Sequence, residues 1–209
     1  QHIVEALRAY THEFTNKLHV ILGLLQLGEN RQAEEYVLRL TKTRAHSISY
    51  ISERIQEPSV AALLIGKSYR AAELGIRFVL DPASELRGDG QYLPASSLIT
   101  ILGNLTENAF DALRSAPENA QKEVTVSIRE GEHGMLLSVD DSGAGMAAPQ
   151  LDRIFERGFS TKGEGRGTGL SLVKETVDAF GGTIRVESEP GIGSSFIITL
   201  SDAESRAQT

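Results

Sequence analysis

Cysteine is absent from this chain of 209 residues. Its absence excludes a disulfide framework and a thiolate metal site, and it fits a reducing cytosol. Positive charge is also in short supply, because 21 Lys and Arg stand against 28 Asp and Glu, for a net charge of −7. This balance argues against a nucleic-acid binder, which would carry a basic face.

Long apolar runs are missing as well. No stretch reaches the roughly 18 apolar residues that a membrane-spanning helix needs, and there is no signal peptide pattern. The sequence starts at Gln1 rather than Met. We therefore expect a fragment, with any membrane or sensing segment upstream of Gln1.

Residues 1–57 show the pattern of two amphipathic helices joined at Gly28-Glu29-Asn30, with Pro58 marking the end of the domain. Apolar residues recur at coiled-coil spacing in both helices. Two such helices cannot bury their stripes alone, so we expect a homodimeric four-helix bundle. The apolar positions are Leu7, Phe14, Leu18, Ile21 and Leu25, then Ala33, Val37, Leu40, Ile48, Ile51 and Ile55.

Residues 58–209 change to a mixed pattern, which predicts an α/β sandwich of helices on a largely antiparallel sheet. We expect helices over 59–74, 94–114 and 169–180, and a strand over 76–80. Alternating apolar residues predict two hairpins, one turning at 130–134 and the other at 190–191. Residues 143–168 are rich in glycine and irregular.

Two segments of this second domain carry polar groups that suit a nucleotide. Asn104, Asn108 and Asp111 share one helix face, although taken alone they are better explained as a solvated surface. Asp141 follows a strand and begins a DxGxG sequence with Gly143 and Gly145. A carboxylate there can accept a hydrogen bond from an exocyclic amine such as that of adenine, but a plain turn explains the motif as well.

Two further segments frame a glycine-rich loop. Phe155 and Phe159 flank a short cationic turn that ends at Lys162, which by itself indicates little. Residues 163–170 then lead into a helix, where glycines expose backbone N–H groups that can bind phosphate. The loop lacks the Walker spacing and does not follow a strand in a βαβ unit, so P-loop and Rossmann interpretations fail.

The order of these four segments resembles the ATPase superfamily of histidine kinases, gyrase-type topoisomerases, MutL proteins and Hsp90 chaperones. The resemblance implies that Asn108 and Asn104 hold Mg²⁺ and the phosphates, and that Asp141 binds the adenine amine. It implies a mobile lid from Phe155 to Gly167. It brings to the cofactor the residues Gly143, Gly145, Phe155, Phe159, Lys162, Gly165, Arg166, Gly167, Thr168, Gly169 and Leu170. Asn104 stands where family ATPases usually have a Glu base, which fits a kinase that must not hydrolyse ATP.

The first domain contains His12-Glu13 and, one helical turn later, Asn16. His12 lies about 200° around the helix from the seam residue Phe14, so it points away from the bundle. This segment resembles the H box of histidine kinases, and nearly the whole chain is similar to the kinases that sense citrate and C4-dicarboxylates. The resemblance implies that ATP phosphorylates His12, that an aspartate of a response regulator then receives the group, and that Asn16 serves the reverse reaction.

The chemistry of His12 suits this role. Imidazole with its usual pKa of about 6.5 is mainly neutral at cytosolic pH, and Glu13 can keep one ring nitrogen protonated while the other attacks. Two alternatives remain open. Another ATPase of the superfamily would need a base in place of Asn104 and no nucleophilic His, and a non-catalytic dimeric phosphotransfer scaffold would not bind ATP.

Overall fold

The structure is a computed structural model and describes residues 15, 17–41, 46–88, 90–114, 121–159 and 167–201. The chain forms two compact units, Gln1–Arg44 and Ala45–Thr209. This division falls before the helix at 46–54, whereas the sequence placed the domain boundary after residue 57. In the described parts, no helix is long and apolar enough to cross a membrane.

The first unit contains a helix at residues 17–26 and the helix α2, Asn30–Thr41. The first of these ends as a Schellman motif, in which Glu29 N–H donates to the Leu24 carbonyl at 2.9 Å and Gly28 N–H donates to Leu25 at 3.0 Å. The turn predicted at Gly28 is therefore confirmed. Leu18 and Leu25 of the predicted seam remain 48% and 50% exposed, so the described part of one chain does not cover this stripe.

The second unit is built on a five-stranded sheet with the order β1-β2-β3-β5-β4. Only the first pairing, β1 with β2, is parallel, and the other three are antiparallel. The largely antiparallel sheet predicted from the sequence is confirmed. The strands are β1 Arg77–Leu80, β2 Glu123–Glu130, β3 Gly134–Asp141, β4 Thr183–Glu189 and β5 Gly193–Ser201.

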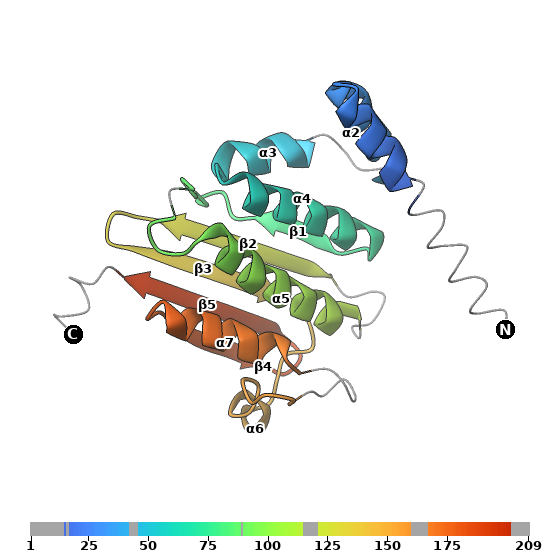
Figure 1. Cartoon of the computed structure of the whole chain (residues 1–209). Coiled ribbons are helices and arrows are strands. Elements are labelled where there is room, and N and C mark those ends of the chain that lie inside the picture. Colours follow the sequence, from blue (N-terminus) through green and yellow to red (C-terminus); the bar gives the residue numbers. More distant parts are fainter. Residues whose placement is uncertain are drawn as a thin grey trace. The chain divides into compact units, whose positions relative to one another are not determined.

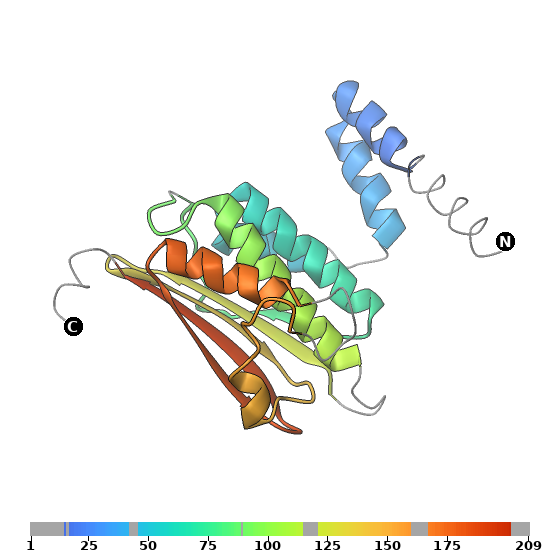
Figure 2. The same cartoon turned by 60° about the horizontal axis from the view of Figure 1, so that its bottom comes forward.

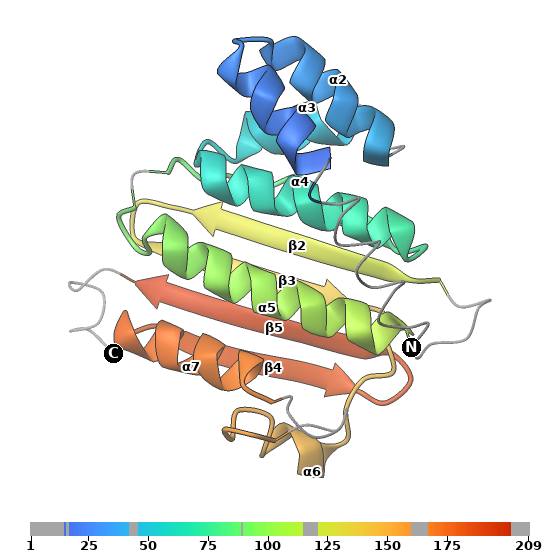
Figure 3. The same ribbon diagram turned by 45° about the vertical axis from the view of Figure 1, so that its right-hand side comes forward.

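Three helices lie side by side across one face of this sheet (Figures 1 and 3): α4 Pro58–Glu73, α5 Ala95–Arg114 and α7 Gly169–Ala179. Figure 2 shows that they form a single layer, so the unit is a two-layer α/β sandwich. Pro58 occupies the first turn of α4, and the Glu57 carboxylate caps that helix by accepting from Val60 N–H at 2.7 Å. The short helix α6, Ala148–Leu151, lies within the segment expected to be irregular.

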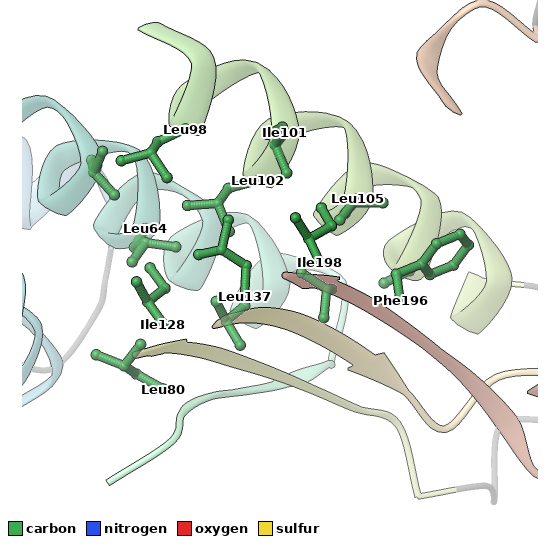
Figure 4. Close-up of a cluster of buried hydrophobic side chains, with 14 of the residues drawn as sticks. Leu64, Leu80, Leu98, Ile101, Leu102, Leu105, Ile128, Leu137, Phe196 and Ile198 are labelled. Atoms are coloured by element: carbon green, nitrogen blue, oxygen red, sulfur yellow. The ribbon is translucent and has the colours of Figure 1, made fainter. Parts of the chain in front are cut away.

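The core fills the space between the helices and the sheet (Figure 4). Leu98, Ile101, Leu102 and Leu105 of α5 point toward Leu137 and Ile198 of the central strands, and all six are at most 2% exposed. The alternation read from the sequence thus marks the side of each strand that faces the helices. The opposite face carries polar residues such as Ser138, Ser195 and Thr199, as an antiparallel sheet with one solvated face permits.

The second helix predicted for the hairpin is described as two elements, α2 and α3, His46–Arg54. Ile51 is buried in the core of the second unit, and Ile55, just beyond α3, pairs with Leu86 in an isolated bridge. These apolar residues keep helical spacing but pack against α4 and its surroundings. The spacing of apolar residues along a helix indicates that one face is buried, but it does not identify the surface against which that face packs.

Candidate functional site

The polar face of α5 forms one wall of the candidate site. Asn104 donates its side-chain amide to the Thr100 carbonyl at 2.7 Å, one turn earlier on the same helix. The Asn108 side-chain nitrogen is buried and has no hydrogen-bond partner in the described parts of the chain. A buried amide without a partner is costly and is characteristic of a position that binds something else.

The start of α7 lies against this face. A Cβ atom placed on Gly169 would come within 2.8 Å of the Asn104 side-chain oxygen, so the glycine permits the close approach of the two helices. Thr168 precedes α7 without making a side-chain cap, and the first turn contains no acidic residue. The backbone N–H groups of that turn and the positive end of the helix dipole therefore suit an anion beside Asn104.

The DxGxG segment forms the second wall, directly after β3. Gly143 N–H donates to the Asp141 carboxylate at 2.8 Å, which fixes the loop over that side chain. A Cβ on Gly143 would lie 2.9 Å from the Ala112 Cβ on α5. The fold thus brings the Asp141 loop to the C-terminal end of α5, just beyond Asn104 and Asn108.

The turn between β4 and β5 contacts this loop and holds it in place. The sequence motifs did not indicate that this turn is part of the site. Gly191 N–H donates to the Ala144 carbonyl at 2.7 Å. Gly145 has φ +64°, and a Cβ there would collide with the Glu189 carbonyl oxygen. Only glycine meets both demands without strain. The spacing Gly191-Ile192-Gly193 was the available signal in the sequence.

The two aromatics of the third segment contact the core from the edge of the site. Phe155 and Phe159 are partly buried against it, and the Arg153 guanidinium lies 4.6 Å from the centre of the Phe159 ring. Gly158 N–H donates to the Gly167 carbonyl at 3.1 Å. The beginning and the end of the predicted lid are therefore in contact through their backbones.

Several predicted site residues lie outside the described residues, namely His12, Glu13, Asn16, Lys162, Gly165 and Arg166. Of those that it describes, the structure places Gly169 against Asn104 and Gly143 against Asp141 and α5, and Leu170 packs against the core. Asn108 lies one turn after Asn104 on α5, Gly145 belongs to the same loop as Gly143, and Gly167 and Thr168 directly precede Gly169. Among the described residues, no group of three or more His, Cys, Asp or Glu side chains could hold a metal. A divalent cation here would instead rely on amide oxygens and on the oxygens of a bound phosphate, which suit Mg²⁺.

Comparison with known families matches both parts of the chain. A family model described as "Histidine kinase-, DNA gyrase B-, and HSP90-like ATPase" matches residues 94–204. A second, described as the alpha-helical domain of SpoOB-type sensor kinases, matches residues 1–53. The first match covers the whole candidate site.

Individual proteins give the same result. The sensor histidine kinase DcuS of Escherichia coli K12 is 44% identical over 94% of this chain and 36% of its own length. A probable C4-dicarboxylate sensor kinase of Halalkalibacterium halodurans is 38% identical over 96% of the chain and 38% of its own length. The solved structure of full-length ShkA in complex with AMPPNP matches with a TM-score of 0.56 and 25% identity, over 94% of this chain and 45% of that one. The resemblance predicted from the sequence is confirmed, and the chain spans less than half the length of each of these relatives.

Proposed function

Because the chain belongs to the histidine kinase-, DNA gyrase B- and HSP90-like ATPases, we propose that it is the catalytic portion of a two-component sensor histidine kinase. It uses ATP to phosphorylate its own His12 and passes the phosphoryl group to an aspartate of a response regulator. The observation that carries this proposal is the contact between Asn104 on the polar face of α5 and Gly169 at the start of α7. It creates a site for the phosphates of a nucleotide next to the Asp141 loop.

In this site Asp141 accepts a hydrogen bond from the adenine amine, and Gly143 and Gly145 let the backbone approach the base. The phosphates lie between α5 and the start of α7, where Gly167 and Gly169 leave backbone N–H groups accessible. The side-chain oxygens of Asn108 and Asn104 would hold Mg²⁺. The unpartnered Asn108 nitrogen is a donor and would bind a phosphate oxygen rather than the ion. When bound, this ion neutralises charge on the phosphates.

The nucleophile comes from the other unit. Glu13 keeps one ring nitrogen of His12 protonated, and the second nitrogen forms a bond to the γ-phosphorus while the bond to the ADP oxygen breaks. Lys162 and Arg166 offset the charge that develops on the leaving oxygen. Asn16, one turn after His12, orients a water molecule for hydrolysis of the aspartyl phosphate of the regulator.

The partners follow from this mechanism. The half-exposed leucines of the first unit are covered by a second copy of the chain in a four-helix bundle, and a receiver domain docks beside His12. The relatives named above are sensor kinases longer than this chain. By analogy, we place the chain in the cytoplasmic portion of an inner-membrane protein.

Labelled ATP tests the proposal directly. Incubation of the chain with γ-labelled ATP and Mg²⁺ should give a phosphoprotein that is labile in acid and stable in base, as phosphohistidine is. Addition of a receiver domain should then remove the label from the chain. Release of free phosphate without a labelled protein would instead indicate another ATPase of the family. If the chain does not bind ATP at all, the remaining explanation is a non-catalytic dimeric phosphotransfer scaffold.

A further inference from the structure

Three polar side chains form a row across one end of the sheet. Asp141 of β3 is the register partner of Ser194 of β5, which in turn is the partner of Ser188 of β4. Two residues earlier along β3, the corresponding row is Val139, Phe196 and Val186, the first two of which are buried under the helices. Because side chains of a strand alternate between faces, the polar row lies on the same side of the sheet.

Ser188 makes three hydrogen bonds within this row and around it. Met146 N–H, in the loop after Asp141, donates to the Ser188 oxygen at 2.8 Å. Ser188 O–H donates to the Gly193 carbonyl at 2.9 Å, and its oxygen lies 3.0 Å from the Ser194 hydroxyl. One side chain thus connects the loop that follows Asp141 to the β4–β5 turn beneath it.

The proton count fixes the direction of the third bond. A serine hydroxyl has one proton and two lone pairs. Ser188 gives its proton to the Gly193 carbonyl, so the proton between the two serines must come from Ser194. The Ser194 oxygen is then left as an acceptor, and it lies across from Asp141 at the distance of directly paired side chains, about 5 Å between Cβ atoms.

We propose that Ser188 is a positioning residue for recognition of the nucleotide base. It holds the loop that follows Asp141 through Met146 N–H, and it orients the Ser194 hydroxyl so that this group accepts hydrogen bonds. This inference rests on the proposed function, in which Asp141 binds the adenine amine. It adds the prediction that the site prefers a 6-amino purine to a 6-oxo purine.

The selectivity follows from the polarity of the row. The Asp141 carboxylate and the oriented Ser194 hydroxyl both accept hydrogen bonds, as an amine requires. A 6-oxo group would bring a third acceptor against these two, and the repulsion between acceptors at this position disfavours the analogue. Removal of the Ser188 hydroxyl frees the Ser194 proton to turn toward a 6-oxo group.

The test compares the affinities of the 209-residue chain for ADP and for inosine diphosphate, measured by calorimetry at fixed Mg²⁺. Ser188→Ala should lower the preference for ADP about tenfold, the effect of one hydrogen bond. Ser188→Thr keeps the hydroxyl and should keep the preference. Ser195→Ala is the matched control, because Ser195 neighbours Ser194 on the same strand but belongs to the opposite face of the sheet. If Ser188→Ala does not melt cooperatively, Ser188→Cys replaces it, since a thiol is a weak donor and acceptor.

Asp141→Asn distinguishes a failure of the proposed role of Asp141 from a failure of the proposed role of Ser188. If this variant retains the wild-type preference for ADP, the assignment of Asp141 in the proposed function is wrong. If Asp141→Asn loses the preference while a folded Ser188→Ala retains it, only the role of Ser188 is overturned. An equal loss of affinity for both nucleotides in Ser188→Ala also overturns it, because a purely structural role predicts that result.

Discussion

At the scale of the residue, Asn108 combines a stability cost with a proposed function. Its buried side-chain nitrogen lacks a hydrogen-bond partner in the described parts of the chain, although its helix is otherwise well packed. Such a group costs about 1–3 kcal/mol in the absence of a ligand. A residue that is unfavourable for the empty fold is the expected signature of a ligand-binding position.

Asn108→Ala should therefore separate stability from activity. We expect the free energy of unfolding to stay within about 1 kcal/mol of wild type or to rise, because the unpartnered amide is removed. Mg²⁺-dependent autophosphorylation should be lost. Urea denaturation and a labelled-ATP assay measure the two effects, and Ser96→Ala, an exposed position on the same helix, is the control. Full activity in Asn108→Ala would place the cation elsewhere.

His12 is the residue on which the proposed reaction depends. His12→Gln should abolish autophosphorylation, because an amide nitrogen is not nucleophilic, while affinity for ATP remains at the wild-type level. Calorimetry with ADP and the acid lability of the label measure the two properties. His19→Gln, an exposed position on the following turns, should behave as wild type. Persistence of acid-labile label in His12→Gln would mean that another histidine accepts the phosphoryl group.

At the scale of the element, α5 has two functions at once. One side presents Asn104 and Asn108 to the site, and the other packs into the core through residues such as Leu105 and Phe110. Phe110 is 1% exposed, and its ring contacts that of Phe78 on β1 edge to face, with centroids 6.5 Å apart. The position of the asparagines therefore depends on how firmly the opposite side of the helix is packed.

Phe110→Ala should lower the free energy of unfolding by about 3–5 kcal/mol, through lost burial and the cavity that remains. The edge-to-face contact with Phe78 contributes to this loss. Urea denaturation followed by circular dichroism measures it. Phe180→Ala is the control, because Phe180 is 37% exposed at the end of α7 and its truncation should cost much less. Equal losses in both variants would contradict the central position of α5 in the core.

At the scale of the whole molecule, the exposed apolar stripe of the first unit predicts that another protein surface covers it. Leu18 and Leu25 keep about half of their surface accessible in one chain, at 48% and 50%, while the second unit closes its own core. Monomeric proteins seldom leave such contiguous stripes uncovered. A second copy of the same hairpin supplies a matching stripe.

Leu18→Asp should weaken this dimer by more than tenfold, since a charge would be buried in the seam. Ile21→Asp should have the same effect. Sedimentation equilibrium at micromolar concentration measures association, and Gln26→Asp, an exposed residue one position past the seam, is the control. A wild-type chain that sediments as a monomer would overturn the prediction.

The local structure and the residue types of the site could be read from the sequence alone. Alternating valines and isoleucines defined the strands, and the glycine at 28 defined the end of a helix. The spacing of Asn104 and Asn108 placed both on one face of α5. These properties are encoded within a few residues, because helices and strands impose periods of 3.6 and 2 on their side chains.

Contacts between segments that are distant in the sequence depend on the tertiary structure. The parallel pairing of β1 with β2 and the packing of Ile51 in the second unit rather than in the hairpin depend on contacts across the fold. The same is true of the row Asp141, Ser194 and Ser188, in which each residue reads as an ordinary polar position along its own strand. Strand register joins them, and register is set by the burial of whole strands against the helices rather than by any local pattern.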